Sequence, residues 1–254
     1  MDMTARERVT VALDVDTEAQ ARAIVNALGD AAHAYKIGLQ LLTAAGPGLM
    51  RELAAAGKCV FLDLKLFEIP TSLAGAVRAA ATQGAKMVTV HASAGAVILR
   101  AAVEAARPWP GLKVLALTVV TSLNDADLRE VGVEAGTAAQ TVRLARLAET
   151  AGCHGVVASA HEVGMLRDLL GPQMLRVTPG VRWRGGSGQG PAQSSAPSTT
   201  NTSMRSTSPV DAFRASATHI VIGRSITQAD DPRAAFDAVC AECAEALARA
   251  GVLT

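Results

Sequence analysis

Short apolar runs alternate with longer amphipathic segments along almost the whole chain. The runs predict strands at 9–14, 34–38, 60–66, 87–91, 113–120, 155–158, 174–178 and 219–222. The segments between them repeat apolar residues at helical spacing and predict helices at 17–28, 39–56, 71–83, a stretch ending near 107, 137–151, 160–170, 211–217 and 231–250. A shorter helical turn is expected at 125–130, and Gly46-Pro47 is expected to interrupt the second helix.

This alternation of eight strands with helices predicts the fold class. It indicates an α/β protein with a single domain over residues 1–254, a (β/α)8 TIM barrel. An open, doubly wound sheet is the alternative. The first predicted strand is not followed by the G-x-G-x-x-G fingerprint of dinucleotide-binding sheets, which favours the barrel.

Polar residues collect where the predicted strands end. In a barrel, the carboxyl ends of the strands form one face, and barrel enzymes place their chemistry on that face. We therefore expect a shared site there, formed by Asp14, Lys36, Asp63, Lys65, His91, Thr121, Ser122, Gly180 and Arg224.

The third predicted strand ends in three charged residues. Asp63 and Lys65 are two positions apart, so on an extended chain their side chains point the same way. Glu68 follows in the loop, and Pro70 suits the first turn of the next helix. Because an isolated ion is costly to bury, such charges are either paired or catalytic. A structural ion pair is the simpler interpretation, but the alternation of acid, base and acid favours an active site.

Several of these residues also have ordinary structural interpretations. Asp14 could cap the helix that follows it, and Lys36 could be a surface lysine. His91 could form a hydrogen bond inside the barrel mouth. Gly223-Arg224, after the eighth strand, stands where many barrels bind a phosphate through backbone N–H groups and an arginine.

Residues 182–209 differ in composition from the rest of the chain. They contain a Gly-rich run at 185–190 and Ser-rich and Thr-rich runs at 194–203, with few apolar residues. Such a segment cannot bury a core, so we expect a long polar, mobile loop within the barrel domain. Its place favours a lid over the catalytic face, and its low complexity favours a linker.

Composition restricts the remaining function classes. Half of the 254 residues are hydrophobic and only 3% are aromatic, which suits helices packed on a parallel sheet. The net charge is +1 and no basic run is present, so no nucleic acid partner is predicted. The sequence shows no secretory signal and no membrane-spanning run, and its scattered cysteines suit reduced thiols; a cytoplasmic location with no membrane partner is expected. Cys240 and Cys243 form a C-x-x-C that we interpret as helix packing rather than a metal or redox site.

A series of short motifs in a fixed order resembles one family. They are A-L-D at 12–14, Y-K-I-G at 35–38, D-L-K at 63–65 with I-P at 69–70, V-H-A at 90–92, residues 117–123, T-P-G-V-R at 178–182 and V-I-G-R at 221–224. Through them the chain resembles the orotidine 5'-phosphate decarboxylase family from residue 11 to about 232. The resemblance implies a homodimeric TIM-barrel lyase of pyrimidine biosynthesis. Such an enzyme converts orotidine 5'-phosphate to UMP and uses no metal and no organic cofactor.

The resemblance also implies a role for each site residue. Lys65 would protonate C6 of the pyrimidine, and Asp63 would lie against the departing carboxylate. An acid from the partner subunit of the dimer would complete the charge array. The implied catalytic residues are Lys65, Asp63, Lys36 and Glu68. The implied substrate-binding residues are Asp14 and Lys36 at the ribose, Ile69 and Ser72 across the dimer interface, Thr121 and Ser122 at the base, Arg182, Gly223 and Arg224 near the phosphate, and Pro179 and Gln189.

Two departures from the family pattern leave alternatives open. Glu68 stands where the family has Asp, and its extra methylene moves the carboxylate further than a catalytic array normally tolerates. In the seventh loop, Gln189 is the nearest candidate for the glutamine that closes on the phosphate, and the basic residue that follows it in the family is absent. The chain could therefore be a diverged member that acts on another phosphorylated pyrimidine, nucleotide or sugar phosphate. It could also be an inactive nucleotide-binding protein.

Overall fold

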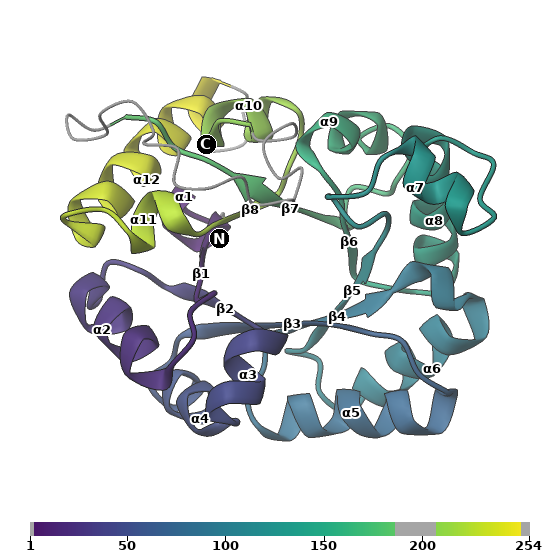
Figure 1. Ribbon diagram of the computed structural model, residues 1–254, viewed down its shortest axis with the longest axis horizontal. Coiled ribbons are helices and arrows are strands. Elements are labelled where there is room, and N and C mark those ends of the chain that lie inside the picture. The colour runs from purple at the N-terminus through teal and green to yellow at the C-terminus, as the bar shows by residue number, and fades with distance from the viewer. Residues whose placement is uncertain (1–2, 186–206, 250–254) are drawn as a thin grey trace.

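The computed structural model describes residues 3–185 and 207–249. Eight parallel strands of this part of the chain close into a barrel in sequence order, and the helices lie around the outside of the ring (Figure 1). The ring is closed by the first and last strands, where Thr10 pairs with Val221. The predicted (β/α)8 TIM barrel is confirmed, and the open doubly wound sheet is excluded.

The elements are short and follow one another closely. The strands are β1 (Val9–Ala12), β2 (Ala34–Gly38), β3 (Cys59–Leu66), β4 (Met87–His91), β5 (Lys113–Leu117), β6 (Gly155–Val157), β7 (Leu175–Val181) and β8 (His219–Ile222). The helices are α1 (Ala5–Arg8), α2 (Glu18–Leu28), α3 (Leu39–Ala45), α4 (Gly48–Ala55), α5 (Pro70–Thr82), α6 (Ala96–Ala106), α7 (Asp125–Glu130), α8 (Thr137–Thr150), α9 (Ala160–Val163), α10 (Pro209–Arg214), α11 (Arg224–Thr227) and α12 (Pro232–Arg249). Two 3-10 turns are η1 (Ala92–Ala94) and η2 (Gly164–Leu166).

Most element boundaries agree with the sequence, and a few do not. The interruption at Gly46-Pro47 is confirmed, since α3 ends just before it and α4 begins just after. The predicted helix at 160–170 is wrong: one α-helical turn, α9, gives way to η2 at Gly164, a residue with poor helix propensity. The seventh strand continues past its predicted end to Val181. The strand passes through Gly180, whose φ of 75° is a conformation that glycine adopts without steric cost. The pairing with β8 shifts register at the same place.

Two apolar layers hold the barrel together. Inside the ring lies a small cluster formed by Ala12, Phe61, Met87, Leu115, Leu117, Val157, Val177 and Val221. The alternate strand residues, such as Val11, Tyr35 and Leu62, belong to a larger cluster that includes buried helix residues. Beyond this inner cluster, toward the carboxyl ends of the strands, the inward-facing side chains therefore face the barrel mouth.

Candidate active site

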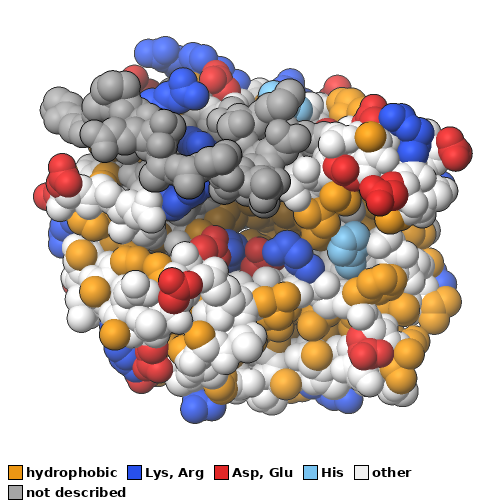
Figure 2. Space-filling view, viewed as in Figure 1, with side chains coloured by type: hydrophobic (Ala, Val, Ile, Leu, Met, Phe, Trp, Pro, Cys, Tyr) orange, Lys and Arg blue, Asp and Glu red, His pale blue; other side chains and the backbone are white. Residues whose placement is uncertain are grey.

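Four charged side chains meet at the carboxyl ends of β1, β2 and β3. The ammonium of Lys36 lies 2.7 Å from Oδ1 of Asp14 and 3.6 Å from Oδ2 of Asp63. The ammonium of Lys65 lies 2.9 Å from the same Oδ2 of Asp63. Figure 2 shows side chains of both signs gathered beside a histidine at a hollow in the middle of this face. The structure thus brings together Asp14, Lys36, Asp63 and Lys65, as the sequence predicted.

Asp63 is the centre of this charge cluster. Its side chain is only 12% exposed, and the side chain of Lys36 is only 9% exposed. One carboxylate oxygen faces both ammonium groups, while the other accepts a hydrogen bond of 2.9 Å from the hydroxyl of Thr89. The side chain of Lys65 is 41% exposed, so its ammonium is held on one side and open on the other. This is the geometry of a cation that can meet a ligand in the mouth.

The alternation of β3 explains why these groups face inward. Phe61 lies in the inner cluster, whereas Leu62 and Leu64 pack against the outer one, so Asp63 follows Phe61 on the inner side. The pairing with β4 is irregular between Leu62 and Leu66. Within that irregularity, Lys65 has a φ of 50°, in the left-handed region that non-glycine residues rarely adopt. Such local strain is typical of functional sites and must be held by its surroundings.

The structural alternatives for Asp14 and Lys36 are excluded by their contacts. The N-cap of α2 is Thr17, whose hydroxyl accepts a hydrogen bond from the backbone N–H of Gln20 at 3.2 Å, so Asp14 does not cap this helix. Lys36 is 7% exposed and is not a surface lysine. Gly38 borders the pair: a Cβ there would lie 3.4 Å from both Oδ1 of Asp14 and Nζ of Lys36, at the edge of ordinary van der Waals contact.

His91 makes the ordinary hydrogen bond that the sequence left open. Its Nδ1 lies 2.6 Å from the hydroxyl of Ser93, and its ring centroid is 6.0 Å from that of Phe67. Burial, and secondarily the positive charge of Lys65, lower the pKa of His91 below its usual value. A neutral imidazole beside the cluster adds no further positive charge near Lys65 at pH 7.

Glu68 lies apart from the charge cluster of its own chain. The residue is exposed, and its carboxylate accepts a hydrogen bond of 2.6 Å from the backbone N–H of Ile69. Ser72, on the first turn of α5, is exposed as well. Phe67 and Ile69 are 66% and 60% exposed, which is unusual for large apolar side chains. The predicted interface residues therefore share one exposed rim of the barrel.

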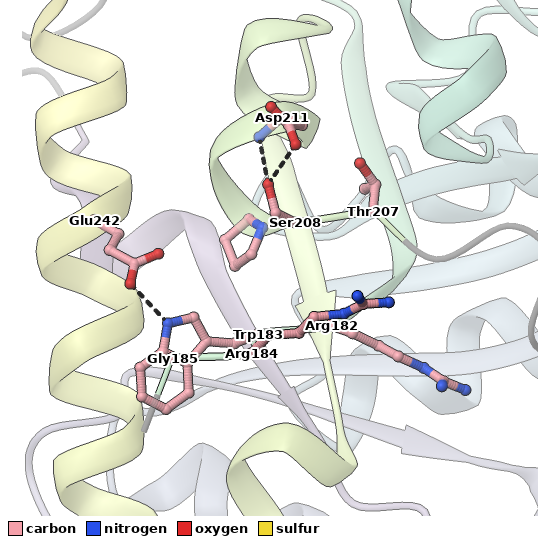
Figure 3. A pocket seen from close by; sticks show the side chains of 9 residues that line it. Arg182, Trp183, Arg184, Gly185, Thr207, Ser208, Asp211 and Glu242 are labelled. Carbon is pink, nitrogen blue, oxygen red and sulfur yellow. Dashed lines mark hydrogen bonds between the residues drawn. The ribbon is translucent and has the colours of Figure 1, made fainter. Parts of the chain in front are cut away.

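The segments that contain Arg182 and Arg224 are joined after β7 and β8. The backbone N–H of Trp183 donates a hydrogen bond of 3.1 Å to the hydroxyl of Ser225, on the short helix α11 that Gly223 precedes. Figure 3 shows the indole of Trp183 turned toward α12, where it donates to Glu242 at 2.8 Å, and the side chains of Arg182 and Arg184 on the other side. Two guanidinium groups thus lie on the side of this segment opposite α12.

A cavity of about 410 Å³ adjoins this segment. None of the four clustered charges lines it; the lining residues are Arg182, Trp183, Arg184, Gly185, Thr207, Ser208, Pro209, Asp211 and Glu242. Its lining residues come from the end of β7 and the residues after it, from α10 and the residues before it, and from α12, rather than from the ends of β1 to β3.

The remaining predicted residues lie toward the same ends of the strands. Thr121 and Ser122 lie in the turn between β5 and α7, and Pro179 lies within β7. Gln189, and most of the loop predicted at 182–209, fall outside the described residues. Thr89, which contacts both Asp63 and Lys65, was missed by the sequence analysis. The available signal was its inward position on β4, two residues before His91.

Within the described residues, two other kinds of site are not found. No group of three or more His, Cys, Asp or Glu side chains is arranged to hold a metal ion. None of the described helices combines the length and the apolar character needed to cross a membrane. The titratable groups described at the barrel mouth are the ammonium groups of Lys36 and Lys65, the carboxylates of Asp14 and Asp63, and the imidazole of His91 beside them.

The fold and the family matches below define a (β/α)8-barrel enzyme, and its charge cluster lies at the carboxyl ends of the strands. Residues 7–239 match the model of the orotidine 5'-phosphate decarboxylase / HUMPS family, and the chain belongs to this family. It is 44% identical over 239 residues to orotidine 5'-phosphate decarboxylase of Anaeromyxobacter dehalogenans, covering 94% of this chain and 99% of that one. Identity to the enzyme of the same name from Caulobacter vibrioides is 45% over 249 residues, or 95% and 99% of the two chains.

A solved structure agrees with this assignment. The crystal structure of orotidine 5'-phosphate decarboxylase from Lactobacillus acidophilus is similar with a TM-score of 0.78 and 34% identity. The similarity covers 92% of this chain and 98% of that one, so it extends over nearly the full length of both.

Proposed function

We propose that this chain decarboxylates orotidine 5'-phosphate to UMP, as a carboxy-lyase of pyrimidine synthesis. The observation that supports this most is the ammonium of Lys65 held 2.9 Å from Asp63 in the barrel mouth, with Lys36 on the same carboxylate oxygen. The family and the names of its relatives support the same reaction. The four cysteines are free thiols, which supports the predicted cytoplasmic location.

The charges at the mouth suit the electronic demand of this reaction. When the bond between C6 and the carboxylate breaks, CO2 leaves and an electron pair remains on a ring carbon that stabilises it poorly. A fixed ammonium beside C6 stabilises that developing charge, and Lys65 then donates its proton to form the new C6–H bond. The ion pair with Asp63 holds the ammonium in place for this step.

The rest of the substrate would be held by groups around the mouth. Asp14 and Lys36 would bind the ribose hydroxyls, since a carboxylate accepts and an ammonium donates hydrogen bonds. Arg182 and Arg224 would bind the phosphate, for which guanidinium groups are well suited. Thr121, Ser122 and Pro179 would line the space for the base. Binding energy from the distant phosphate would position the ring over Lys65.

The assay for the proposed function is direct. Purified protein is mixed with orotidine 5'-phosphate without added metal, and the loss of absorbance of the orotate ring is followed together with UMP formation. Turnover that persists in the presence of a chelator is expected. No turnover, or activity lost on chelation, would contradict the proposal, and the latter would indicate the metal-dependent sugar phosphate alternative.

The exposed rim supports a homodimer with the active sites at its interface. Phe67, Ile69 and Val97 are 60–66% exposed, and they flank Glu68 and the connection between β4 and α6. A group of large exposed apolar side chains at one rim is typical of an interaction surface. We propose that a second copy of the chain covers this rim and that the loop of Glu68, Ile69 and Ser72 reaches the partner's charge cluster.

Phe67→Glu is expected to convert the dimer into a monomer and to lower kcat by at least about 10-fold, because a buried carboxylate at the interface has no partner. Size-exclusion chromatography with light scattering and steady-state kinetics measure the two effects. The control is Val131→Glu, since Val131 is 72% exposed at the end of α7 and away from this rim. A Phe67→Glu protein that remains a fully active dimer would contradict the proposed interface.

A diverged reaction remains the second candidate because of Glu68. If the longer side chain places the carboxylate outside the position that the family's Asp occupies, Glu68→Asp is expected to raise kcat for orotidine 5'-phosphate by a few fold. Glu68→Gln is the matched control, since it keeps the length and removes the charge. A clear drop in kcat for Glu68→Asp would show instead that the site is tuned to the longer acid, and would favour a different substrate.

A further inference from the structure

Thr89 connects the two central groups of the charge cluster through one hydroxyl. Its Oγ1 accepts a hydrogen bond of 2.8 Å from the backbone N–H of Lys65 and donates one of 2.9 Å to Oδ1 of Asp63. Thr89 is fully buried on β4, at 0% exposure. A hydroxyl can donate and accept at once, so both bonds form without conflict.

The place of Thr89 in the sheet explains what these bonds do. On β3 and β4, Leu62 pairs with Val88 and Leu66 with Val90, so the residues between Leu62 and Leu66 on β3 face the single residue Thr89 on β4. The extra residues form a bulge, which re-aims side chains next to active sites. The hydroxyl of Thr89 fills this bulge and accepts the N–H of Lys65, whose φ of 50° takes it out of the regular strand conformation.

The same hydroxyl also orients the carboxylate of Asp63. That carboxylate accepts a hydrogen bond from the hydroxyl of Thr89 on Oδ1 and one from the ammonium of Lys65 on Oδ2, at 2.9 Å each. Rotation of the carboxylate would move Oδ2 away from Lys65, and the bond on Oδ1 opposes this rotation. Thr89 therefore acts on both ends of the pair, on the backbone of the lysine and on the side chain of the aspartate.

We propose that Thr89 is a positioning residue, which fixes the backbone of Lys65 and the carboxylate of Asp63 so that the ammonium is aimed at the reacting carbon. The inference rests on the proposed function for its kinetic consequence. A displacement of about 1 Å at such a group can lower the rate by about 100-fold. The product UMP lacks the departing carboxylate, so its binding depends little on this alignment.

The test compares Thr89→Ser with Thr89→Ala, two variants that both lose the methyl group and differ only in the hydroxyl. Thr89→Ser is expected to keep kcat within about 3-fold of the unmodified protein, and Thr89→Ala to lose about 10- to 100-fold. The KM and the Kd for UMP are expected to change by less than about 3-fold in either. Thr10→Val is the control, because Thr10 is also buried in a barrel strand and its hydroxyl has no hydrogen-bond partner within the described residues.

Amide hydrogen exchange at Lys65 gives a second readout that does not depend on turnover. Exchange of this N–H is expected to be slow in the unmodified protein and in Thr89→Ser, and faster in Thr89→Ala. If the Ser and Ala variants had the same kcat, whether unchanged or equally reduced, the proposal would be overturned, since the hydroxyl would then make no difference. If the unmodified protein does not decarboxylate orotidine 5'-phosphate, the proposed function fails, and the exchange data alone decide whether Thr89 holds Lys65.

Discussion

Lys65→Ala is expected to lower kcat for orotidine 5'-phosphate by at least about 1,000-fold, while the Kd for UMP changes by less than about 10-fold. In the proposed mechanism, the substitution removes both the charge that stabilises the carbanion and the proton that completes the reaction. It leaves Asp14, Lys36 and the two arginines proposed to hold the ribose and phosphate. Stopped or quenched assays at high enzyme concentration and calorimetric titration with UMP measure the two quantities.

Two further variants isolate the role of the ammonium. Lys65→Met keeps most of the length of the side chain without its charge and is expected to be as inactive as Lys65→Ala. Lys113→Ala removes a lysine at the start of β5, at the opposite end of the barrel, and is expected to leave kcat unchanged. Residual turnover of Lys65→Ala within 10-fold of the unmodified protein would mean that another group supplies the proton.

Asp63→Asn is expected to lower kcat by about 100- to 1,000-fold. The substitution keeps the shape of the side chain but removes the negative charge that faces the ammonium groups of Lys36 and Lys65, at 3.6 and 2.9 Å. Lys36 keeps its ion pair with Asp14, but no carboxylate then lies between the two ammonium groups, and the ammonium of Lys65 moves from its position. Because Asp63 is largely buried, a loss of thermal stability is also expected, so activity is measured below the unfolding transition.

Asp14→Asn gives the matched comparison for Asp63. Asp14 also pairs with Lys36, at 2.7 Å, but its side chain is 54% exposed and it does not contact Lys65. We therefore expect Asp14→Asn to raise KM, through weaker ribose binding, with a smaller effect on kcat. Similar kcat losses in both variants would show that Asp63 has no role beyond that of a second partner for Lys36.

The sequence predicted the barrel and the main charge cluster because both follow from simple periodicities. Alternation with a period of two placed Asp63 and Lys65 on one side of β3, and parallel strands brought their ends to the same face. The ion pair between the exposed Asp14 and the buried Lys36 could not be assigned from the sequence. Thr17 and Gln20 nevertheless form a capping box that could have been recognised in the sequence as the start of α2. That would have excluded Asp14 as the N-cap of this helix.

The role of Thr89 could not be predicted from periodicity. It depends on the bulge between Leu62 and Leu66 and on the left-handed backbone of Lys65, and neither is encoded by a glycine or another local signal. The position of Glu68 has a similar origin: within the described residues its carboxylate accepts a hydrogen bond from the N–H of its neighbour Ile69, and its proposed partner belongs to a second copy. Long-range strand register determines the position of Lys65, and the proposed dimer would determine the surroundings of Glu68.

A crystal structure of the protein with UMP bound tests the central claim most directly. We expect Nζ of Lys65 to lie within about 3–3.5 Å of C6 of the uracil ring. We also expect Asp14 and Lys36 to contact the ribose, and the phosphate to lie between Arg182 and Arg224. A uracil ring bound elsewhere, or a Lys65 ammonium directed away from C6 toward solvent, would contradict it.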